Sequence, residues 1–494
     1  MKNLRSVVQN FGKILCVFGV LWALCGLSFS QEQPPAPTAP TAIHVPAVQQ
    51  TVLPNKLTVA VVTRKNVPLV TVQLLVKSGA NAEGAANAGL ADMTATLLTK
   101  GTKTRSATEI AEEMEFLGGG ISAGAGWNSS QVYVNAMSDK TDQAMAIMSD
   151  VILNPAFDQK EIDLLKSQYL DGLSFSLKQP GFLATYAASK YSFEEHPAGG
   201  TVDSINRITQ QQINDFHNKR FIPENCVLIF TGDITSIQAF ALAKKFFSSW
   251  KNPPPENPHY MISSEKEIAS NAKTVNRILV IDLPNSGQAS VNYAKNLKFI
   301  RREEKGKYFP ATVLNSLLGG GYSSRLNQEI RIKRGLSYGA GSSFVWRDWK
   351  TNFSTRTQTK NESAAEVAEL VVKEIERLSA EGIPDSELTP RKSVLTGGFG
   401  RGLETTAGLA DQVANLYTFD LPLTELNSYT PGVNGVTAAQ IKGFASANFK
   451  GGDMIIVGDA KMFMDDLKKR FPGMSITVIK ADELDLTSDT LIKK

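Results

Sequence analysis

Apolar residues along the chain follow two periods, and each period predicts a different kind of element. Apolar positions that recur every three or four residues predict amphipathic helices, whereas short apolar or alternating runs predict strands. One helix begins with a capping box formed by Ser106 and Glu109. Hairpins mixed with packed helices predict an α+β fold, in which helices cover one face of an antiparallel sheet. Further helices are expected over 139–152 and 363–378, and strands over 57–63, 71–76, 131–136, 227–230, 277–281 and 454–457.

Three short motifs occur twice in the same order, which predicts a duplicated fold with two homologous lobes. They are Ile-Ser-Ala-Gly-Ala-Gly, Ile-Thr-Gln-Gln-Gln-Ile and the Gly-Asp that follows an apolar strand. The first copies lie at 121–126, 208–213 and 232–233, and the second copies lie at 336–341, 436–441 and 458–459.

The 494 residues are more than a single hydrophobic core supports, so at least two domains are expected. Two proline-rich stretches mark the divisions, because consecutive prolines exclude helices and central strands. The predicted parts are a signal peptide at 1–30, a Pro/Ala-rich linker at 31–50, an N-terminal lobe at 51–250, a Pro-rich linker at 251–270 and a C-terminal lobe at 271–485.

The N-terminus is typical of an export signal. Lys2 and Arg5 precede an apolar run at 14–27, which has the length of a signal-peptide core and is short for a membrane span. Small residues at Ser28 and Ser30 favour cleavage after Ser30. We therefore expect an exported protein, periplasmic or extracellular, without stable membrane insertion after cleavage. An uncleaved membrane anchor and a lipoprotein site within the apolar run remain alternatives.

Charge and composition argue against nucleic acid as a partner and against a metal held by cysteines or histidines. The formal charge of +4 falls to about +1 without the signal, which gives no electrostatic basis for binding nucleic acid. Cys226 is the one cysteine after the signal and is expected to be a small buried hydrophobe. The four histidines are not spaced to share a metal, and His217 is expected at the surface or its boundary; they are His44, His196, His217 and His259.

The segment 89–102 resembles the signature helix of the pitrilysin/insulinase-type zinc peptidases. In that family Gly-Leu-Ala precedes an inverted His-x-x-Glu-His motif, and Lys-Gly-Thr closes the segment. Glu-His-Pro at 195–197, Ile-Thr at 208–209 and Gly-Asp at 232–233 resemble later landmarks of the family. The resemblance extends over about 50–480 and implies two α/β lobes that close a chamber between them.

The zinc ligands of that family are replaced in this sequence. Asp92 stands at the first histidine, Ala95 at the glutamate and Thr96 at the second histidine, and the third ligand would fall near Asp171 or Gly172. One carboxylate and one hydroxyl do not hold catalytic zinc. The resemblance therefore implies a degenerate site, with no metal ligands and no cofactor in this chain.

A second stretch, 317–338, matches the family more closely. In active relatives an arginine and a tyrosine seven residues apart face the zinc site and bind the substrate backbone. Arg331 and Tyr338 stand at these positions and would be the substrate-binding residues, since guanidinium and phenol groups donate strongly to carbonyl oxygens. On residue type alone, Arg331 fits a surface arginine and Tyr338 fits strand packing. Arg325 fits better as a structural residue at a helix start.

A replaced zinc motif beside a retained Arg/Tyr pair implies a non-catalytic subunit. Such a chain would bind peptide and complete the chamber of a homologous zinc-bearing partner, and we expect no catalysis by the chain alone. The alternative is a structural or scaffold module with no role toward substrate. An enzyme with unrecognised chemistry is the third hypothesis, although neither a Ser/His/Asp nor a Cys/His arrangement is visible in the sequence.

Overall fold

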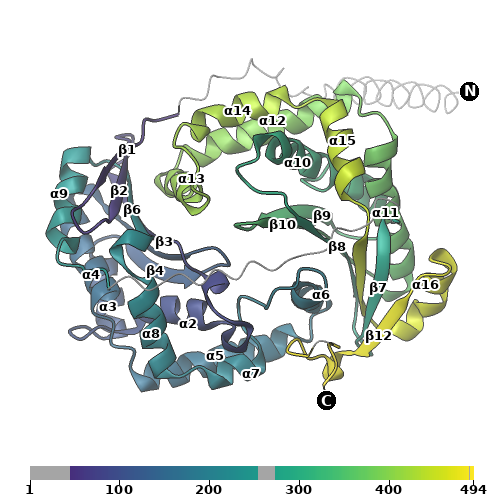
Figure 1. Ribbon diagram of the computed structural model, residues 1–494, viewed down its shortest axis with the longest axis horizontal. Helices are drawn as coiled ribbons and strands as arrows, with labels where there is room; N and C mark the ends of the chain where they lie inside the picture. The colour runs from purple at the N-terminus through teal and green to yellow at the C-terminus, as the bar shows by residue number, and fades with distance from the viewer. Residues whose placement is uncertain (1–44, 254–272, 489, 494) are drawn as a thin grey trace, which may run out of the picture. The chain divides into compact units, whose positions relative to one another are not determined.

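The computed structural model describes residues 45–253, 273–488 and 490–493. The predicted signal peptide, most of both linkers, His44 and His259 lie outside the described residues. The described part holds two six-stranded sheets, ordered β1-β2-β6-β3-β5-β4 and β12-β7-β11-β8-β10-β9 (Figure 1). We call the part before residue 254 the N-terminal lobe and the part after residue 272 the C-terminal lobe.

Each lobe contributes one sheet. The strands of the N-terminal lobe are β1 (Gln49–Val52), β2 (Thr58–Thr63), β3 (Leu69–Val76), β4 (Gly120–Ala125), β5 (Ser130–Met137) and β6 (Cys226–Gly232). The strands of the C-terminal lobe are β7 (Val275–Asp282), β8 (Ala289–Lys298), β9 (Ala340–Trp346), β10 (Lys350–Thr359), β11 (Gly452–Gly458) and β12 (Ile476–Lys480). The orders β2-β6-β3-β5-β4 and β7-β11-β8-β10-β9 correspond strand by strand, so the predicted two-lobed α+β fold is confirmed.

The sheets are mixed, which corrects the prediction of antiparallel sheets. β2 pairs in parallel with β6, and β7 pairs in parallel with both β11 and β12. A parallel pair requires a long crossover connection. Here most of each lobe, with its helices, lies between the paired strands β2 and β6 or β7 and β11. The pattern of apolar residues predicts where the strands lie in the sequence. It does not predict whether two distant strands pair in parallel or antiparallel.

Helices cover the sheets in both lobes. In the N-terminal lobe they are α2 (Leu90–Leu97), α3 (Ala107–Phe116), α4 (Thr141–Leu153), α5 (Gln159–Ser176), α6 (Pro180–Tyr191), α7 (Val202–Arg207), α8 (Gln210–Arg220) and α9 (Ser236–Phe247). In the C-terminal lobe they are α10 (Lys305–Leu318), α11 (Ala364–Ala380), α12 (Asp385–Gly402), α13 (Thr406–Thr418), α14 (Glu425–Gly435), α15 (Ala438–Asn448) and α16 (Met464–Arg470), with a π-helix at Asn327–Ile332.

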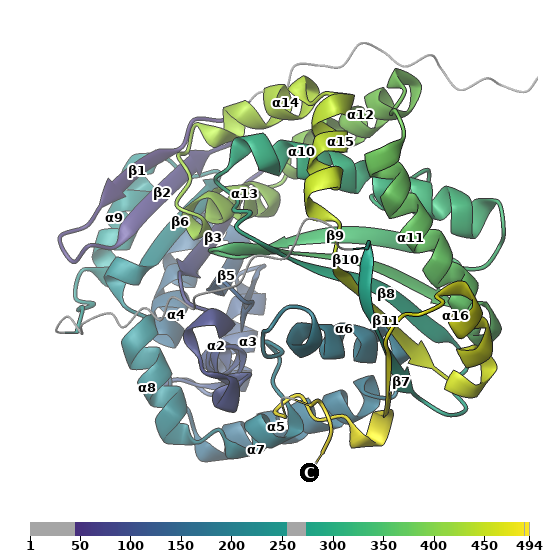
Figure 2. The ribbon, with the colours of Figure 1, turned by 45° about the vertical axis from the view of Figure 1, so that its right-hand side comes forward.

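Two helices are exchanged between the lobes. α6 of the N-terminal lobe packs against β8 and β11 of the other sheet, and α13 of the C-terminal lobe packs against β3 and β6 (Figure 2). Through α6, one apolar core runs from the N-terminal lobe onto a face of the second sheet. The continuous apolar strands β7 and β11 are therefore buried on both faces, as parallel pairs usually are. The lobes share a core and form one packing unit.

Polar bonds fix α13 on the first sheet. The Thr71 hydroxyl donates to Thr406 Oγ1 over 2.8 Å, and the Thr231 hydroxyl donates to the Thr406 carbonyl over 2.7 Å. The Arg64 guanidinium donates to the Leu403 carbonyl just before the helix. These bonds satisfy polar groups on a sheet face that is buried by the other lobe.

Glycines at 119 and 319 allow close backbone packing between the end of a helix and a neighbouring strand. A Cβ at Gly119 would lie 1.9 Å from the Asn135 carbonyl oxygen, and one at Gly319 would lie 2.2 Å from the Ser342 nitrogen. Only glycine permits this approach.

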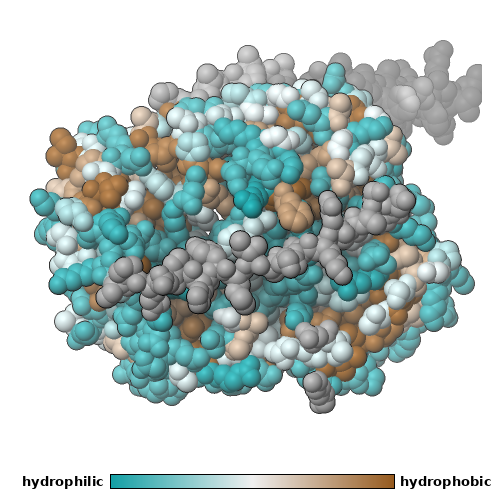
Figure 3. Space-filling model, in the orientation of Figure 1, coloured by the Kyte–Doolittle hydropathy of each residue, from teal (hydrophilic) through white to brown (hydrophobic). Residues whose placement is uncertain are grey.

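Burial in the described residues agrees with most sequence expectations. Cys226 is buried and forms no disulfide, and burial raises its pKa. The capping box of Ser106 and Glu109 is formed at α3. Figure 3 shows a largely hydrophilic surface on the visible face. None of the helices described is both long and apolar enough to cross a membrane.

The expectation that His217 lies at the surface or its boundary is wrong. Its side chain is buried, and its Nε2 lies 2.9 Å from the Ile152 carbonyl oxygen. The ring stacks on Phe221 and meets Phe157 edge-on. Burial lowers the pKa of His217, so the neutral imidazole is favoured. The charged neighbours on α8 suggest exposure, but this residue lies on the face that packs against α4.

Candidate functional site

The site begins at α2, which follows a tight turn at Gly89. Gly89 has a φ of +93°, in the left-handed region that favours glycine. The Glu83 carboxylate accepts the backbone N–H groups of Gly89 and Ala91 over 2.7 and 2.6 Å, so it caps the helix. Burial raises the pKa of Glu83 to about 8, although these two donors act in the opposite direction. His196 Nδ1 lies 3.8 Å from the same carboxylate.

Asp92 and Thr96 lie on one face of α2 and meet the same tyrosine. Asp92 Oδ1 accepts the Ala125 backbone N–H over 3.0 Å, and Asp92 Oδ2 accepts the Tyr169 hydroxyl over 2.8 Å. The Tyr169 oxygen also lies 3.1 Å from Thr96 Oγ1. Ala95 is fully buried. Both oxygens of the Asp92 carboxylate are therefore engaged within the protein.

Tyr169 is the site residue that the sequence analysis missed. The third position was expected near Asp171 or Gly172 on α5, but Asp171 is exposed and a Cβ on Gly172 would touch nothing within 4 Å. Leu165, Tyr169 and Leu173 recur every fourth residue on the inner face of α5, where the two leucines are buried and Tyr169 is partly buried. That spacing was the available signal, and it directs Tyr169 at α2.

This donor set does not fit catalytic zinc. It offers one carboxylate with both oxygens bound, one hydroxyl and one phenol, whereas such sites use histidines and carboxylates. Among the residues that the structure describes, no group of three or more His, Cys, Asp or Glu side chains is placed to hold a metal ion. The expectation that this chain carries no zinc stays a prediction.

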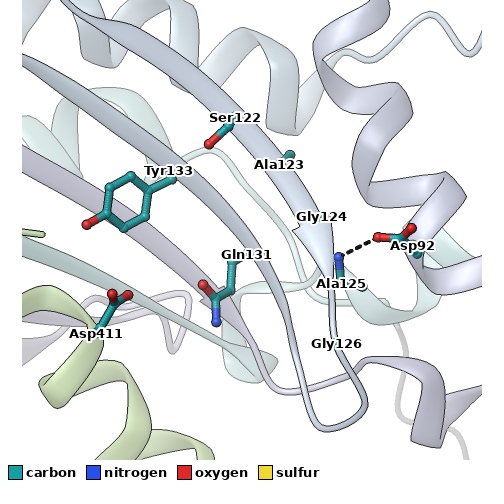
Figure 4. Close-up of a pocket in the computed structure, with 9 residues that line it drawn as sticks. All are labelled: Asp92, Ser122, Ala123, Gly124, Ala125, Gly126, Gln131, Tyr133 and Asp411. Atoms are coloured by element: carbon teal, nitrogen blue, oxygen red, sulfur yellow. Dashed lines mark hydrogen bonds between the residues drawn. The ribbon is translucent and has the colours of Figure 1, made fainter. Parts of the chain in front are cut away.

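A pocket of about 540 Å³ lies beside this network, between β4, β5 and α13 (Figure 4). Its lining includes Asp92 at one end and Asp411 of α13 on the opposite wall. β4 is an edge strand of the sheet, so one of its sides lacks a strand partner. The pocket thus extends from Asp92 of α2 along β4, the strand at the edge of the sheet.

The Arg/Tyr pair lies outside this pocket, on the segment of the C-terminal lobe that joins α10 to β9. Arg331 is half-buried in the π-helix and packs over the Tyr322 ring, 4.8 Å from its centre. Tyr338 precedes β9 and is 90% exposed. Tyr322, at 62%, is exposed on the same segment. Arg325, in contrast, is buried and forms two 2.8 Å bonds to Glu387, as a structural residue would.

Two family models match the chain along both lobes. The model for the insulinase peptidases, family M16, matches residues 58–174, and the model for the M16 inactive domain matches residues 207–395. The chain belongs to the insulinase family, M16. The peptidase model covers α2, and the inactive-domain model covers the end of the N-terminal lobe and the first part of the C-terminal lobe.

The relatives of this chain include proteins named as zinc proteases and a protein named as a non-peptidase homolog. An uncharacterized zinc protease of Mycobacterium tuberculosis is 26% identical over 391 residues, which cover 75% of this chain and 83% of the relative. A non-peptidase homolog of Helicobacter pylori, YmxG, is 24% identical over 417 residues, covering 81% and 91%. The solved M16 inactive domain from Pseudomonas fluorescens is 25% identical with a TM-score of 0.73, covering 83% of this chain and 98% of that one.

A buried ion cluster joins the two lobes of this insulinase-type chain near α2. Glu195 accepts hydrogen bonds from Arg347 over 3.2 and 3.1 Å and from Asn352 over 2.9 Å, and it lies 3.2 Å from Lys350 Nζ. The Arg347 guanidinium also lies over the Trp127 ring. The sequence singled out Glu195 as a family landmark but gave no indication of its partners in the other lobe.

Replacing Glu83 with glutamine is expected to flatten the pH dependence of stability between pH 5 and 8. The folded-state pKa of about 8 lies above the ordinary glutamate value of 4.5, so the fold favours the protonated acid. Stability from this group is present below pH 4.5 and is lost as pH rises toward 8. At about 1.4 kcal/mol per pKa unit, the loss is on the order of a few kcal/mol. Urea unfolding at several pH values measures it.

The slope is the informative quantity for Glu83→Gln, because the amide also replaces one acceptor at the helix start and lowers stability at every pH. Glu109→Gln is the matched control, since Glu109 also caps a helix but is exposed. If the parent and Glu83→Gln lose stability equally from pH 5 to 8, the raised pKa is refuted.

Proposed function

We propose that this chain is an exported, non-catalytic subunit of an insulinase-type peptidase, which binds peptide and completes the chamber of a zinc-bearing partner. The observation that carries the proposal is the closed network of Asp92, Thr96 and Tyr169. By the sequence resemblance, this network stands where the family activates water with zinc, and Ala95 would offer no general base there. The family match to an inactive type of domain supports the same conclusion.

The exposure of Tyr338 supports a role toward a partner rather than toward this chain's own α2. A tyrosine that is 90% exposed contributes little to folding, and Arg331, seven residues earlier, packs over the exposed Tyr322 ring. In this proposal the pair reaches the zinc site of the partner and donates to the substrate carbonyl as negative charge develops on it.

The edge strand β4 supports peptide binding by this chain. An extended peptide can pair with an unpaired strand edge, with backbone bonds giving affinity and side-chain pockets giving selectivity. The pocket bounded by β4 and α13 lies on this edge. Export rests on the N-terminal sequence, with the membrane-anchored form as the alternative location.

The purified chain alone is expected to bind substoichiometric zinc and to cleave no peptide in a mixed library. Adding a homologous subunit with an intact His-x-x-Glu-His motif from the same genome should give a stable complex and cleavage that chelators abolish. Metal analysis, size-exclusion chromatography and mass spectrometry of the peptides measure these outcomes. Stoichiometric zinc with chelator-sensitive cleavage by the chain alone would refute the proposal. A complex that forms but shows no peptide binding by this chain would favour the scaffold alternative.

A further inference from the structure

The pocket beside β4 has a polar inner wall made by two paired strands and one helix. Ser122 and Gly124 of β4 lie opposite Tyr133 and Gln131 of β5, so these four residues share one face of the sheet. Figure 4 shows Tyr133 and Gln131 directed toward the wall that carries Asp411. Gly124 bears no side chain, which leaves room on this face.

The charges in the pocket are not balanced. Its lining holds two carboxylates, those of Asp92 and Asp411, and no basic residue. Asp92 is saturated by Ala125 and Tyr169, whereas Asp411 makes neither an ion pair nor a hydrogen bond within the part of the chain that the structure describes. Desolvation raises the pKa of Asp411, since no nearby cation offsets it.

The Tyr133 hydroxyl supplies a second acceptor at the pocket. Its hydroxyl oxygen is buried and forms no hydrogen bond of ordinary geometry among the described residues, although Thr71 lies near enough to lower its pKa. Burial and the negative charge of Asp411 both raise the pKa of Tyr133, which places the two groups within electrostatic reach of each other. A buried polar atom without a partner is costly unless a ligand or water satisfies it.

The strand edge determines how a peptide would meet these groups. The Ala125 N–H points away from β5, because it donates to Asp92. In an antiparallel pair the direction of the N–H groups alternates, so those of Ile121 and Ala123 point to the same edge, which has no strand partner. A strand added there would direct every second side chain to the face of Ser122 and Gly124. This face of the sheet lines the same pocket as Asp411.

We infer that this pocket selects extended peptides with a lysine or arginine side chain, and that Asp411 determines the preference. The inference rests on the proposed peptide-binding function and adds its substrate class. The cationic side chain donates to the Asp411 carboxylate and to the Tyr133 oxygen, and the peptide backbone pairs with β4. Arginine satisfies both acceptors with its fork of N–H donors.

The test is a binding series on the full purified chain. Fluorescently labelled peptides of one sequence are N-acetylated and carry lysine, arginine, norleucine or glutamate at a single central position. Fluorescence anisotropy gives their dissociation constants. Lysine and arginine peptides are expected to bind about fivefold more tightly than the norleucine peptide, since Asp411 remains partly solvated. An unacetylated norleucine peptide shows whether a terminal ammonium also binds.

Asp411→Asn is expected to remove the preference for cationic side chains and leave the norleucine affinity unchanged. Asp385→Asn is the matched control, because Asp385 is an exposed carboxylate of the same lobe outside the pocket. Tyr133→Phe should reduce the preference in part.

Equal affinity for lysine and norleucine in the parent chain would overturn the inference and leave peptide binding intact. A preference that survives Asp411→Asn would also overturn it. If no peptide of the series binds, the proposed peptide-binding function fails together with the inference.

Discussion

Replacing Arg331 with alanine and Tyr338 with phenylalanine is expected to lower peptide cleavage by the two-subunit complex at least about a hundredfold. Removing one donor to a developing oxyanion costs on the order of a hundredfold in rate, and this variant removes two. Tyr338 is 90% exposed and Arg331 contacts an exposed ring, so the chain should unfold at nearly the same urea concentration as the parent. Initial rates with the zinc-bearing partner in excess measure the loss.

Lys333→Ala is the matched control for this effect. Lys333 is exposed two residues from Arg331 and pairs with Glu329, so its removal takes away one positive charge from the same segment. The control should stay within about twofold of the parent, because exposed ion pairs contribute little. Full cleavage by the Arg331/Tyr338 variant, with complex formation intact, would exclude a substrate role for the pair and favour the scaffold alternative.

Replacing Glu195 with alanine is expected to lower the free energy of unfolding by about 3 kcal/mol. Breaking a buried ion pair leaves the partner charge unpaired and poorly solvated. In this variant Arg347 and Lys350 both lose the carboxylate that they share. The Arg347 and Lys350 side chains are 16% and 17% exposed to solvent. This partial solvation places the expected loss of stability at the lower end of the range for broken buried ion pairs. Urea unfolding followed by tryptophan fluorescence measures it.

Glu194 provides the neighbouring control for Glu195. It is exposed and pairs with Lys298 over 3.3 Å, so Glu194→Ala should change stability by less than about 1 kcal/mol. Equal effects of the two substitutions would show that the cluster does not hold the lobes together. Because Glu195 joins the N-terminal lobe to β10 and to the turn that precedes it, its loss should also raise protease sensitivity near residues 193–197.

Local patterns account for the elements and for the family. The capping box at Ser106, the apolar strands and the repeated motifs each depend on residues close together in sequence, and such preferences survive in the fold. The replaced ligands Asp92, Ala95 and Thr96 are also a property of the sequence. They are the basis of the prediction that α2 carries no zinc ligands.

Tertiary structure decided how these pieces meet. Sequence alone determined two similar lobes, but only packing showed that α6 and α13 are exchanged, because an amphipathic face does not specify which sheet it covers. Tyr169 reaches Asp92, and Glu195 binds Arg347, across large sequence separations that no local period encodes. The burial of His217 and the parallel strand pairs arise for the same physical reason: they depend on where distant segments of the chain return.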